Sequence, residues 1–281
     1  LRATHRLRTA ALEILAGKRC SSSQQSCRKS VQSPSTWVNQ GFCNGSRQSP
    51  INIVDASVQY NASLGTFTFT NYSDSSKLLL LNNPGHTVEV QLASGVTLSG
   101  GGLLSTYSAV AFHFHWGNTS QNGSEHQLGG RQFPMEMHIV HTKNGMNLTA
   151  AKQDPTGIAV LGFFIDVRTM CSIQFHIVIP SVLSGTNITL NGSFSIDSIL
   201  GAVDRTSYYR YLGSLTTPTC DEAVVWTVFR NPILVPANVI QSFSSNLSLS
   251  STGSPQNMVN NFRILQQLNS RVVQSSTNVN S

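Results

Sequence analysis

The chain has 281 residues, which is enough for one large domain, and nothing in it repeats at the spacing of a solenoid or a propeller. Only 11% of the residues are charged, and this balance favours short strands and many turns. The net charge of +6 comes from residues 1–30, which hold seven Lys or Arg against Glu13 alone, so the domain beyond them is neutral and no nucleic-acid partner is expected.

Residues 1–35 form a basic, Ser-rich arm. Its cations could contact phosphates or anionic lipid, but a disordered arm or residual leader sequence is the preferred interpretation. Residues 9–17 resemble a signal core poorly, because Glu13 interrupts them and no initiator Met is present. We therefore expect that the natural N-terminus is missing or altered.

A single domain is expected over residues 36–268, followed by a polar tail over residues 269–281. Short strand-like runs alternate with turn clusters at residues 66–70, 78–81, 87–92, 109–116, 135–141, 158–167, 174–179 and 223–229. Helices are expected only at residues 195–200 and, as a turn, around residues 239–243. Since no regular crossover helices separate the strands, we predict a mainly β (α+β) domain built on a large, mostly antiparallel twisted sheet with a few short peripheral helices.

The sequons, and not the cysteines, indicate the cellular compartment. The five cysteines form no Cys-x-x-Cys pair, so a zinc ribbon or a thioredoxin-like site is not expected. Asn-x-Ser/Thr sequons are dense, which favours the secretory pathway even if several are accidental. They begin at Asn44, Asn61, Asn71, Asn118, Asn122, Asn147, Asn187, Asn191 and Asn246. No apolar run reaches the roughly 18 residues that a membrane span requires.

Two of the predicted strands carry histidines with the spacing of a metal site. Alternation along a strand sends His113 and His115 to one face and the aromatic residues between and beside them to the other. The second strand likewise places Glu136 and His138 on one face. Paired antiparallel, the strands would offer three imidazoles and an open fourth position, which is typical of a catalytic zinc, with Glu136 fixing the tautomer of His138.

Other interpretations of these histidines exist. Each could be an ordinary strand residue whose ring is satisfied by a backbone carbonyl, although three together with a carboxylate make this the weaker alternative. Copper and nickel also bind imidazole, so the ligands alone do not fix the metal.

Several motifs spread over residues 37–267 resemble those of the α-carbonic anhydrases. They lie at residues 47–53, 83–86, 112–117, 123–126, 136–138 and 211–218. Residues 211–230 look especially like the extracellular, membrane-anchored type-IV and type-XV branch. The resemblance implies a zinc enzyme that reversibly hydrates carbon dioxide to bicarbonate and a proton, by attack of zinc-bound hydroxide.

The resemblance assigns roles to individual residues. His113, His115 and His138 match the zinc ligands, and Thr216 matches a threonine that accepts a hydrogen bond from the hydroxide and donates one to Glu125. Apart from the resemblance, Thr216 is merely one of two threonines before a proline turn. The residues beside the substrate would be Val140, Val160, Leu215, Thr216, Thr217, Val224 and Trp226, although the apolar ones are equally natural as ordinary core.

His86 matches the family's proton shuttle, and a surface imidazole suits proton relay to buffer. Asn261 would accept the proton of a ligand histidine through its backbone carbonyl. Cys43 and Cys220 match the disulfide of the extracellular members; Cys20 and Cys27 could form a second bridge, which leaves Cys171 over.

Two departures from the family pattern affect these roles. Ala111 stands where many members have a polar residue that supports the first histidine, and Pro84 interrupts the usual order before His86. We therefore expect the zinc chemistry to survive, whereas Pro84 could reposition His86 and so affect proton transfer.

The implied partners are carbon dioxide, bicarbonate, sulfonamides and inhibitory anions, on a monomer that is secreted or held at the outer face of the plasma membrane. Contact with the membrane would need a lipid anchor at a small residue such as Ser275, Ser276 or Ser281. One rival hypothesis is a catalytically weak cell-surface recognition module, which the presence of all three histidines with Glu125 and Thr216 disfavours. The other is a zinc hydrolase that acts on esters.

Overall fold

The computed structural model describes residues 37, 39–168, 183–192, 194–249 and 256–279. All of them belong to one compact unit, Ser33–Ser281, which separates from Leu1–Gln32. The predicted arm at residues 1–35 and the predicted strand at residues 174–179 lie outside the described residues. The description that follows concerns the described part of Ser33–Ser281.

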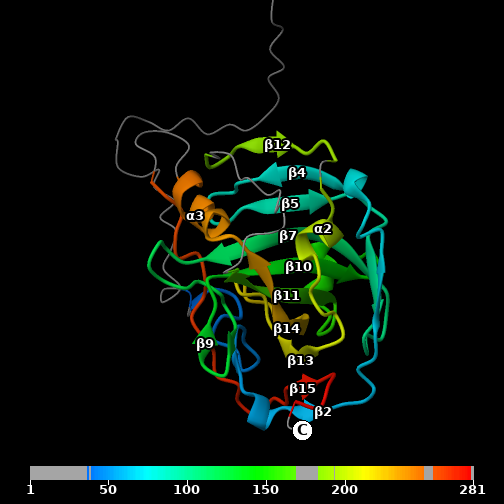
Figure 1. Cartoon of the computed structure of the whole chain (residues 1–281). Coiled ribbons are helices and arrows are strands. Elements are labelled where there is room, and N and C mark those ends of the chain that lie inside the picture. The colour runs from blue at the N-terminus through cyan, green and yellow to red at the C-terminus, as the bar shows by residue number, and fades with distance from the viewer. Residues whose placement is uncertain (1–36, 38, 169–182, 193, 250–255, 280–281) are drawn as a thin grey trace, which may run out of the picture. The chain divides into compact units, whose positions relative to one another are not determined.

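One large sheet dominates this unit, with strand order β12-β4-β5-β7-β10-β11-β14-β13-β15-β2, and β6 pairs with β7 and with β3 (Figure 1). Its strands are β2 (Gln59–Tyr60), β3 (Phe67–Thr70), β4 (Leu78–Asn82), β5 (Glu89–Leu92), β6 (Thr97–Gly100), β7 (Tyr107–Trp116), β10 (Met135–Lys143), β11 (Ile158–Val167), β12 (Asn187–Thr189), β13 (Tyr208–Gly213), β14 (Val224–Val235) and β15 (Gln274–Ser275). A second, three-stranded sheet consists of β1 (Asn52–Ile53), β8 (Gln127–Leu128) and β9 (Arg131–Gln132).

The prediction of a mostly antiparallel sheet is confirmed. In the large sheet only β11 with β14 and β15 with β2 pair in parallel, among the described strands. The β11–β14 pair lies inside the sheet, and its residues 158–165 and 224–229 are all buried and, apart from Thr227, apolar, because both of their faces are covered. The sequence predicted both strands but not their parallel pairing.

Helices are few and short, as predicted. They are α1 (Leu148–Ala151), α2 (Ile196–Leu200) and α3 (Ala237–Asn246), with 3-10 turns η2 (Asp55–Ser57) and η3 (Ser75–Lys77). Ser195 caps α2 by accepting a hydrogen bond from the backbone N–H of Ser198, which explains why the helix begins there. The turn expected around residues 239–243 is the middle of the longer α3.

Alternation along the strands separates two buried clusters. Phe112, Phe114, Met137 and Ile139 join the larger cluster on one face of the sheet, where α3 also packs. Val160, Val224 and Trp226 belong to the second cluster. Because each strand presents alternate residues to opposite faces, the histidines between the aromatic residues of β7 are directed away from the larger cluster.

The last described residues also contribute to the sheet. β15 pairs antiparallel with β13 and parallel with β2, and Ser275 is buried. Residues 274–275, in the segment expected to be a polar tail, are therefore strand residues of the domain.

Candidate metal centre

The register between β7 and β10 brings the predicted ligands together. His138 lies directly opposite His113, and Glu136 lies opposite His115. Directly paired residues of an antiparallel ladder project their side chains to the same face, so three imidazoles and one carboxylate share one patch of the sheet. The alternation predicted from the sequence produces this arrangement.

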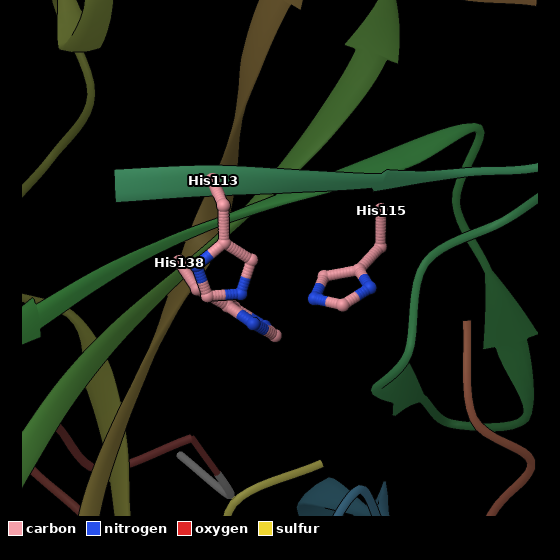
Figure 2. Close-up of side chains that lie close together, drawn as sticks. All are labelled: His113, His115 and His138. Atoms are coloured by element: carbon pink, nitrogen blue, oxygen red, sulfur yellow. The ribbon is translucent and has the colours of Figure 1, made fainter. Parts of the chain in front are cut away.

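The three imidazoles of His113, His115 and His138 converge (Figure 2). Their ring centroids lie 5.0 Å apart for His113 and His115, 5.3 Å for His113 and His138, and 4.7 Å for His115 and His138. One nitrogen from each ring lies within 4.8 Å of the other two, which is close enough for one ion to reach all three.

Hydrogen bonding leaves nitrogen lone pairs available to a metal. His115 donates Nδ1–H to the carbonyl oxygen of Asn261 at 2.9 Å, and His138 donates Nε2–H to Glu136 Oε1 at 2.7 Å. The lone pairs therefore lie on His115 Nε2 and His138 Nδ1. In the part of the chain that the structure describes, the buried His115 Nε2 has no hydrogen-bond partner.

A carboxylate oxygen lies beside the three imidazoles. Glu125 Oε2 is buried, has no hydrogen-bond partner among the described residues, and lies 3.4 Å from His115 Nε2 and 3.9 Å from His138 Nδ1. Lone pairs that face one another without a shared proton are costly to bury. The donor set therefore fits a cation, and nitrogen ligands with one open position fit zinc.

Burial keeps two of the imidazoles in the form that binds metals. Burial lowers the pKa of His113 well below its ordinary value, and the nearby His115 and His138 add to the effect. Burial also lowers the pKa of His115, although Glu125 opposes the shift. Both rings are therefore neutral near pH 7.

A buried chain of hydrogen bonds extends from His138 through Glu136. Glu136 Oε1 also lies 2.7 Å from His126 Nδ1, and its Oε2 accepts the backbone N–H of His126 at 2.8 Å. His126 Nε2 lies 2.6 Å from the hydroxyl of Tyr211, which in turn lies 2.8 Å from Ser49 Oγ. Although burial opposes it, electrostatic interactions and hydrogen bonds with His126 and His138 hold the pKa of Glu136 well below its usual value, so it is ionised.

Sequence reasoning missed His126, Tyr211 and Ser49 as contributors to this chain. Each is at most 2% exposed despite its polar side chain. Their motifs were recognised, but nothing in the spacing of residues so far apart in sequence indicates that they meet. His126, Glu136 and His138 also form a compact group of metal-binding types, but their atoms bond to one another.

Glu125 is fixed from one side only. Its Oε1 accepts the backbone N–H of Arg263 at 2.8 Å, and the Arg263 guanidinium binds Gln48 Oε1 and the carbonyl oxygens of Ser49 and Cys43. Thr216 is buried, but the hydrogen bond expected from it to Glu125 is not formed in the described structure, because Oε2 has no partner.

Asn261 joins several segments around the histidines. Besides its bond to His115, its side chain accepts the backbone N–H of Trp116 at 2.8 Å and donates to the carbonyl oxygens of Phe114 and His86, each at 3.1 Å. The segment that contains His86 is thereby tied to the histidine-bearing strand. The His86 ring is exposed, and its partial enclosure lowers its pKa.

Apolar residues lie beside the histidines. Trp226 stacks edge-on with His138 at 4.8 Å between ring centroids, and Val160 and Val224 belong to the same cluster. Val140 and Leu215 pack against it while partly exposed, and Thr217 is exposed. Among these predicted substrate residues, Val160, Val224 and Trp226 are therefore buried, whereas Val140, Leu215 and Thr217 are accessible to solvent.

The disulfide between Cys43 and Cys220 is present in the structure. Trp226 Nε1 donates to the carbonyl oxygen of Ser214 at 3.0 Å, and the backbone N–H of Leu215 donates to Asp221. The loop that contains Thr216 is thus held at both ends, by β14 and by the bridge.

Comparison with known proteins identifies the family. The sequence model of eukaryotic-type carbonic anhydrases matches residues 32–277. The chain belongs to this family. It is 39% identical over 254 residues to "Carbonic anhydrase 4" of Oryctolagus cuniculus, an alignment that covers 89% of this chain and 81% of the relative. It is 36% identical over 244 residues to "Carbonic anhydrase 12" of Homo sapiens, with 83% and 68% covered.

Family membership confirms the resemblance found in the motifs and shows that the chain is an enzyme. The relatives also include "Carbonic anhydrase 15" of Mus musculus, which is 34% identical over 247 residues and covers 83% of this chain and 76% of the relative. None of the described helices has the length and apolar character needed to cross a membrane.

Proposed function

We propose that this carbonic anhydrase hydrates carbon dioxide reversibly to bicarbonate and a proton, with a zinc ion held by His113, His115 and His138. One observation carries the proposal: one nitrogen from each of the three imidazoles lies within 4.8 Å of the other two, and the buried Nε2 of His115 has no hydrogen-bond partner among the described residues. A bound zinc ion would supply hydroxide near neutral pH by lowering the pKa of water to about 7.

The protein orients the imidazoles around this position. Glu136 holds His138 through Nε2, and the carbonyl oxygen of Asn261 holds His115 through Nδ1. Both bonds fix the tautomer and the ring plane, so that the free lone pairs point inward. The hydrogen-bonded His126 keeps Glu136 ionised and in place.

Thr216 and Glu125 would orient the reacting oxygen. Arg263 holds Glu125 Oε1, which leaves Oε2 to accept the hydroxyl proton of Thr216. The Thr216 oxygen is then restricted to accepting a hydrogen bond from the nucleophile, which aims a lone pair at the substrate. The backbone N–H of Thr216 would bind bicarbonate or an inhibitory anion.

Carbon dioxide would lie against the apolar residues beside His138. Apolar side chains bind water weakly, so an apolar gas can take its place beside them. The side chains concerned are those of Val140, Val160, Leu215, Val224 and Trp226. Thr217 would line the accessible side of the same space. His86, exposed and tied to the site through Asn261, would pass the product proton to buffer.

Location and form are part of the proposal. We infer a monomer at the outside of the cell, secreted or attached through a lipid anchor, since the disulfide between Cys43 and Cys220 suits an oxidising compartment. The similarity to carbonic anhydrases 4, 12 and 15 supports the same location.

The test is the His138→Ala variant, with His86→Ala as the matched histidine control. His138→Ala should lose both bound zinc and carbon dioxide hydration, because two imidazoles seldom retain the ion. His86→Ala should keep its zinc. Its rate of hydration should fall only in weak buffer and should recover when imidazole is added. Metal analysis and stopped-flow hydration report the two effects. Unchanged zinc content in His138→Ala contradicts the ligand set; zinc-loaded wild type without hydration favours the recognition module.

A further inference from the structure

Strand β12 forms one edge of the large sheet and contains the sequon Asn187-Ile188-Thr189. In the described part of the chain its only strand partner is β4, with Ile188 opposite Leu81 (Figure 1). The other side of β12 therefore presents backbone groups that no described strand binds.

The register shows which residues these are. Thr186 accepts a backbone hydrogen bond from Asn83, and Leu190 donates one to Leu79. Hydrogen bonding alternates along an antiparallel strand, so Thr186, Ile188 and Leu190 direct their backbone groups towards β4. Asn187 and Thr189 direct theirs outwards, to the open edge.

Within the described residues around β12, this edge has none of the usual protection. Residues 185–190 contain no charged residue and no proline. Open edges of this kind invite pairing with another chain, and proteins normally block them with lysine, proline, a bulge or a covering group. Both Asn187 and Thr189 are exposed, so a group attached to either side chain would project from the sheet face beside this edge.

The amide of Asn187 is also available, unlike those of several other sequons. The Nδ2 of Asn71 donates to the Gly95 carbonyl at 2.8 Å, and that of Asn122 donates to the Gln132 carbonyl at 2.8 Å. The Asn118 amide is bonded to Gln121 in the same way. Asn187 makes no such bond among the described residues, so a glycan there displaces no hydrogen bond of the fold.

We propose that Asn187 is an N-glycosylation site and that its glycan covers the open edge of the sheet at β12. The inference rests on the extracellular location proposed above. The transfer forms a bond between Asn187 Nδ2 and C1 of the first sugar, breaks the bond from C1 to the pyrophosphate of a lipid-linked oligosaccharide, and releases one amide proton.

The modification is tested on the full chain, expressed through the secretory pathway of a eukaryotic cell. Asn187→Gln and Thr189→Ala should each lose one glycan on gels, and Thr189→Ser, which keeps the sequon, should lose none. Peptide mass spectrometry after enzymatic deglycosylation should find Asn187 converted to aspartate. Glycans on other sequons with none on Asn187 would overturn the inference. A chain with no glycan at all would overturn it together with the extracellular location, while zinc content and hydration still test the catalytic proposal.

The role of the glycan has its own test. Asn187→Gln should self-associate severalfold faster than Thr189→Ser, as followed by light scattering during mild heating. Thr189→Lys also removes the sequon but places a charge at the same edge, so it should stay as monodisperse as Thr189→Ser. Equal association of Asn187→Gln and Thr189→Ser would refute the covering role.

Discussion

Ala111 leaves His113, among the described residues, without the side-chain or backbone partner that the other two histidines of the site have. Asn261 holds His115 and Glu136 holds His138, but Ala111, which is buried two residues before His113 on the same face of β7, has no polar side-chain atom. A ligand whose ring is not held loses more freedom on binding the metal.

Ala111→Gln should therefore bind zinc about 10-fold more tightly, in line with the effect of other partners of metal ligands. The amide oxygen would accept the proton of His113 Nδ1. Competition with a chelator measures the affinity. Ala111→Met adds a side chain of similar length at the same position but has no amide oxygen, so it should leave affinity unchanged; equal gains from both variants would refute the explanation.

His141 should make the protein sensitive to acid. The ring is fully buried, its Nε2 lies 2.6 Å from the hydroxyl of Tyr72, and burial lowers its pKa to about 4. In the unfolded chain the same ring has a pKa of about 6.5. Between these values the unfolded state binds the extra proton, so stability falls as pH falls from 6.5 to 4.

The expected loss from this one group between pH 7 and pH 5 is about 2 kcal/mol. Urea unfolding at the two pH values measures it. His141→Gln cannot take up this proton, so it should lose about 2 kcal/mol less than wild type over the same interval, whatever its stability at pH 7. Parallel losses in the two proteins would show that His141 is not responsible.

At the scale of elements, the loop between β7 and β8 is packed backbone to backbone. A Cβ on Gly123 would overlap the backbone of Trp116 and Gly117, although the φ angle of Gly123 is ordinary. Gly123 precedes Glu125 by two residues, so this close approach places the carboxylate beside the ligand strand.

Gly123→Ala should destabilise the protein by about 1–3 kcal/mol, since backbone cannot move aside as a flexible side chain can. Zinc affinity should fall too if Glu125 shifts. Gly65→Ala is the matched control, because nothing lies within 4 Å of its added Cβ, and it should cost little or stabilise slightly. Thermal unfolding compares the two. Equal stability of the two variants would contradict the packing argument.

The elements that the sequence predicted best are those with a clear pattern. β11 matches its predicted range, and β7 and β10 were found because apolar and polar residues alternate along them. β13 was missed, since its run of aromatic residues around Arg210 shows no alternation. The buried Arg210 is compensated by hydrogen bonds that its guanidinium donates to Thr227 and to the carbonyl oxygen of Gly101. Such compensation depends on contacts between distant segments, which a local pattern does not contain.

The candidate site likewise combines features that a local pattern predicts with features that depend on distant segments. His113, His115, His138 and Glu136 follow from strand alternation, which is local. The bonds of His126 to Tyr211 and of Tyr211 to Ser49 join residues 85 and 162 positions apart in the sequence. Their meeting depends on the pairing of β13 with β14 and of β14 with β11, and no periodicity encodes that order of strands.

At the scale of the whole molecule, the disulfide between Cys43 and Cys220 joins the start of the domain to the loop that contains Thr216 across 177 residues. Gln48 and Arg47 bind Glu222 nearby, and Arg263 binds the carbonyl oxygen of Cys43. The bridge therefore constrains segments on which the proposed reaction depends.

Removing the bridge by Cys43→Ser with Cys220→Ser should lower the free energy of unfolding by about 2–5 kcal/mol, because the closed loop is long. Catalysis should fall further than zinc content, since the bridge restrains Thr216 and not the histidines. Urea unfolding, metal analysis and hydration rates measure the three quantities. A thiol reductant should destabilise wild type far more than the double variant, which separates the effect of this bridge from general damage. If activity per bound zinc is the same in the double variant, the bridge stabilises the fold without positioning the Thr216 loop.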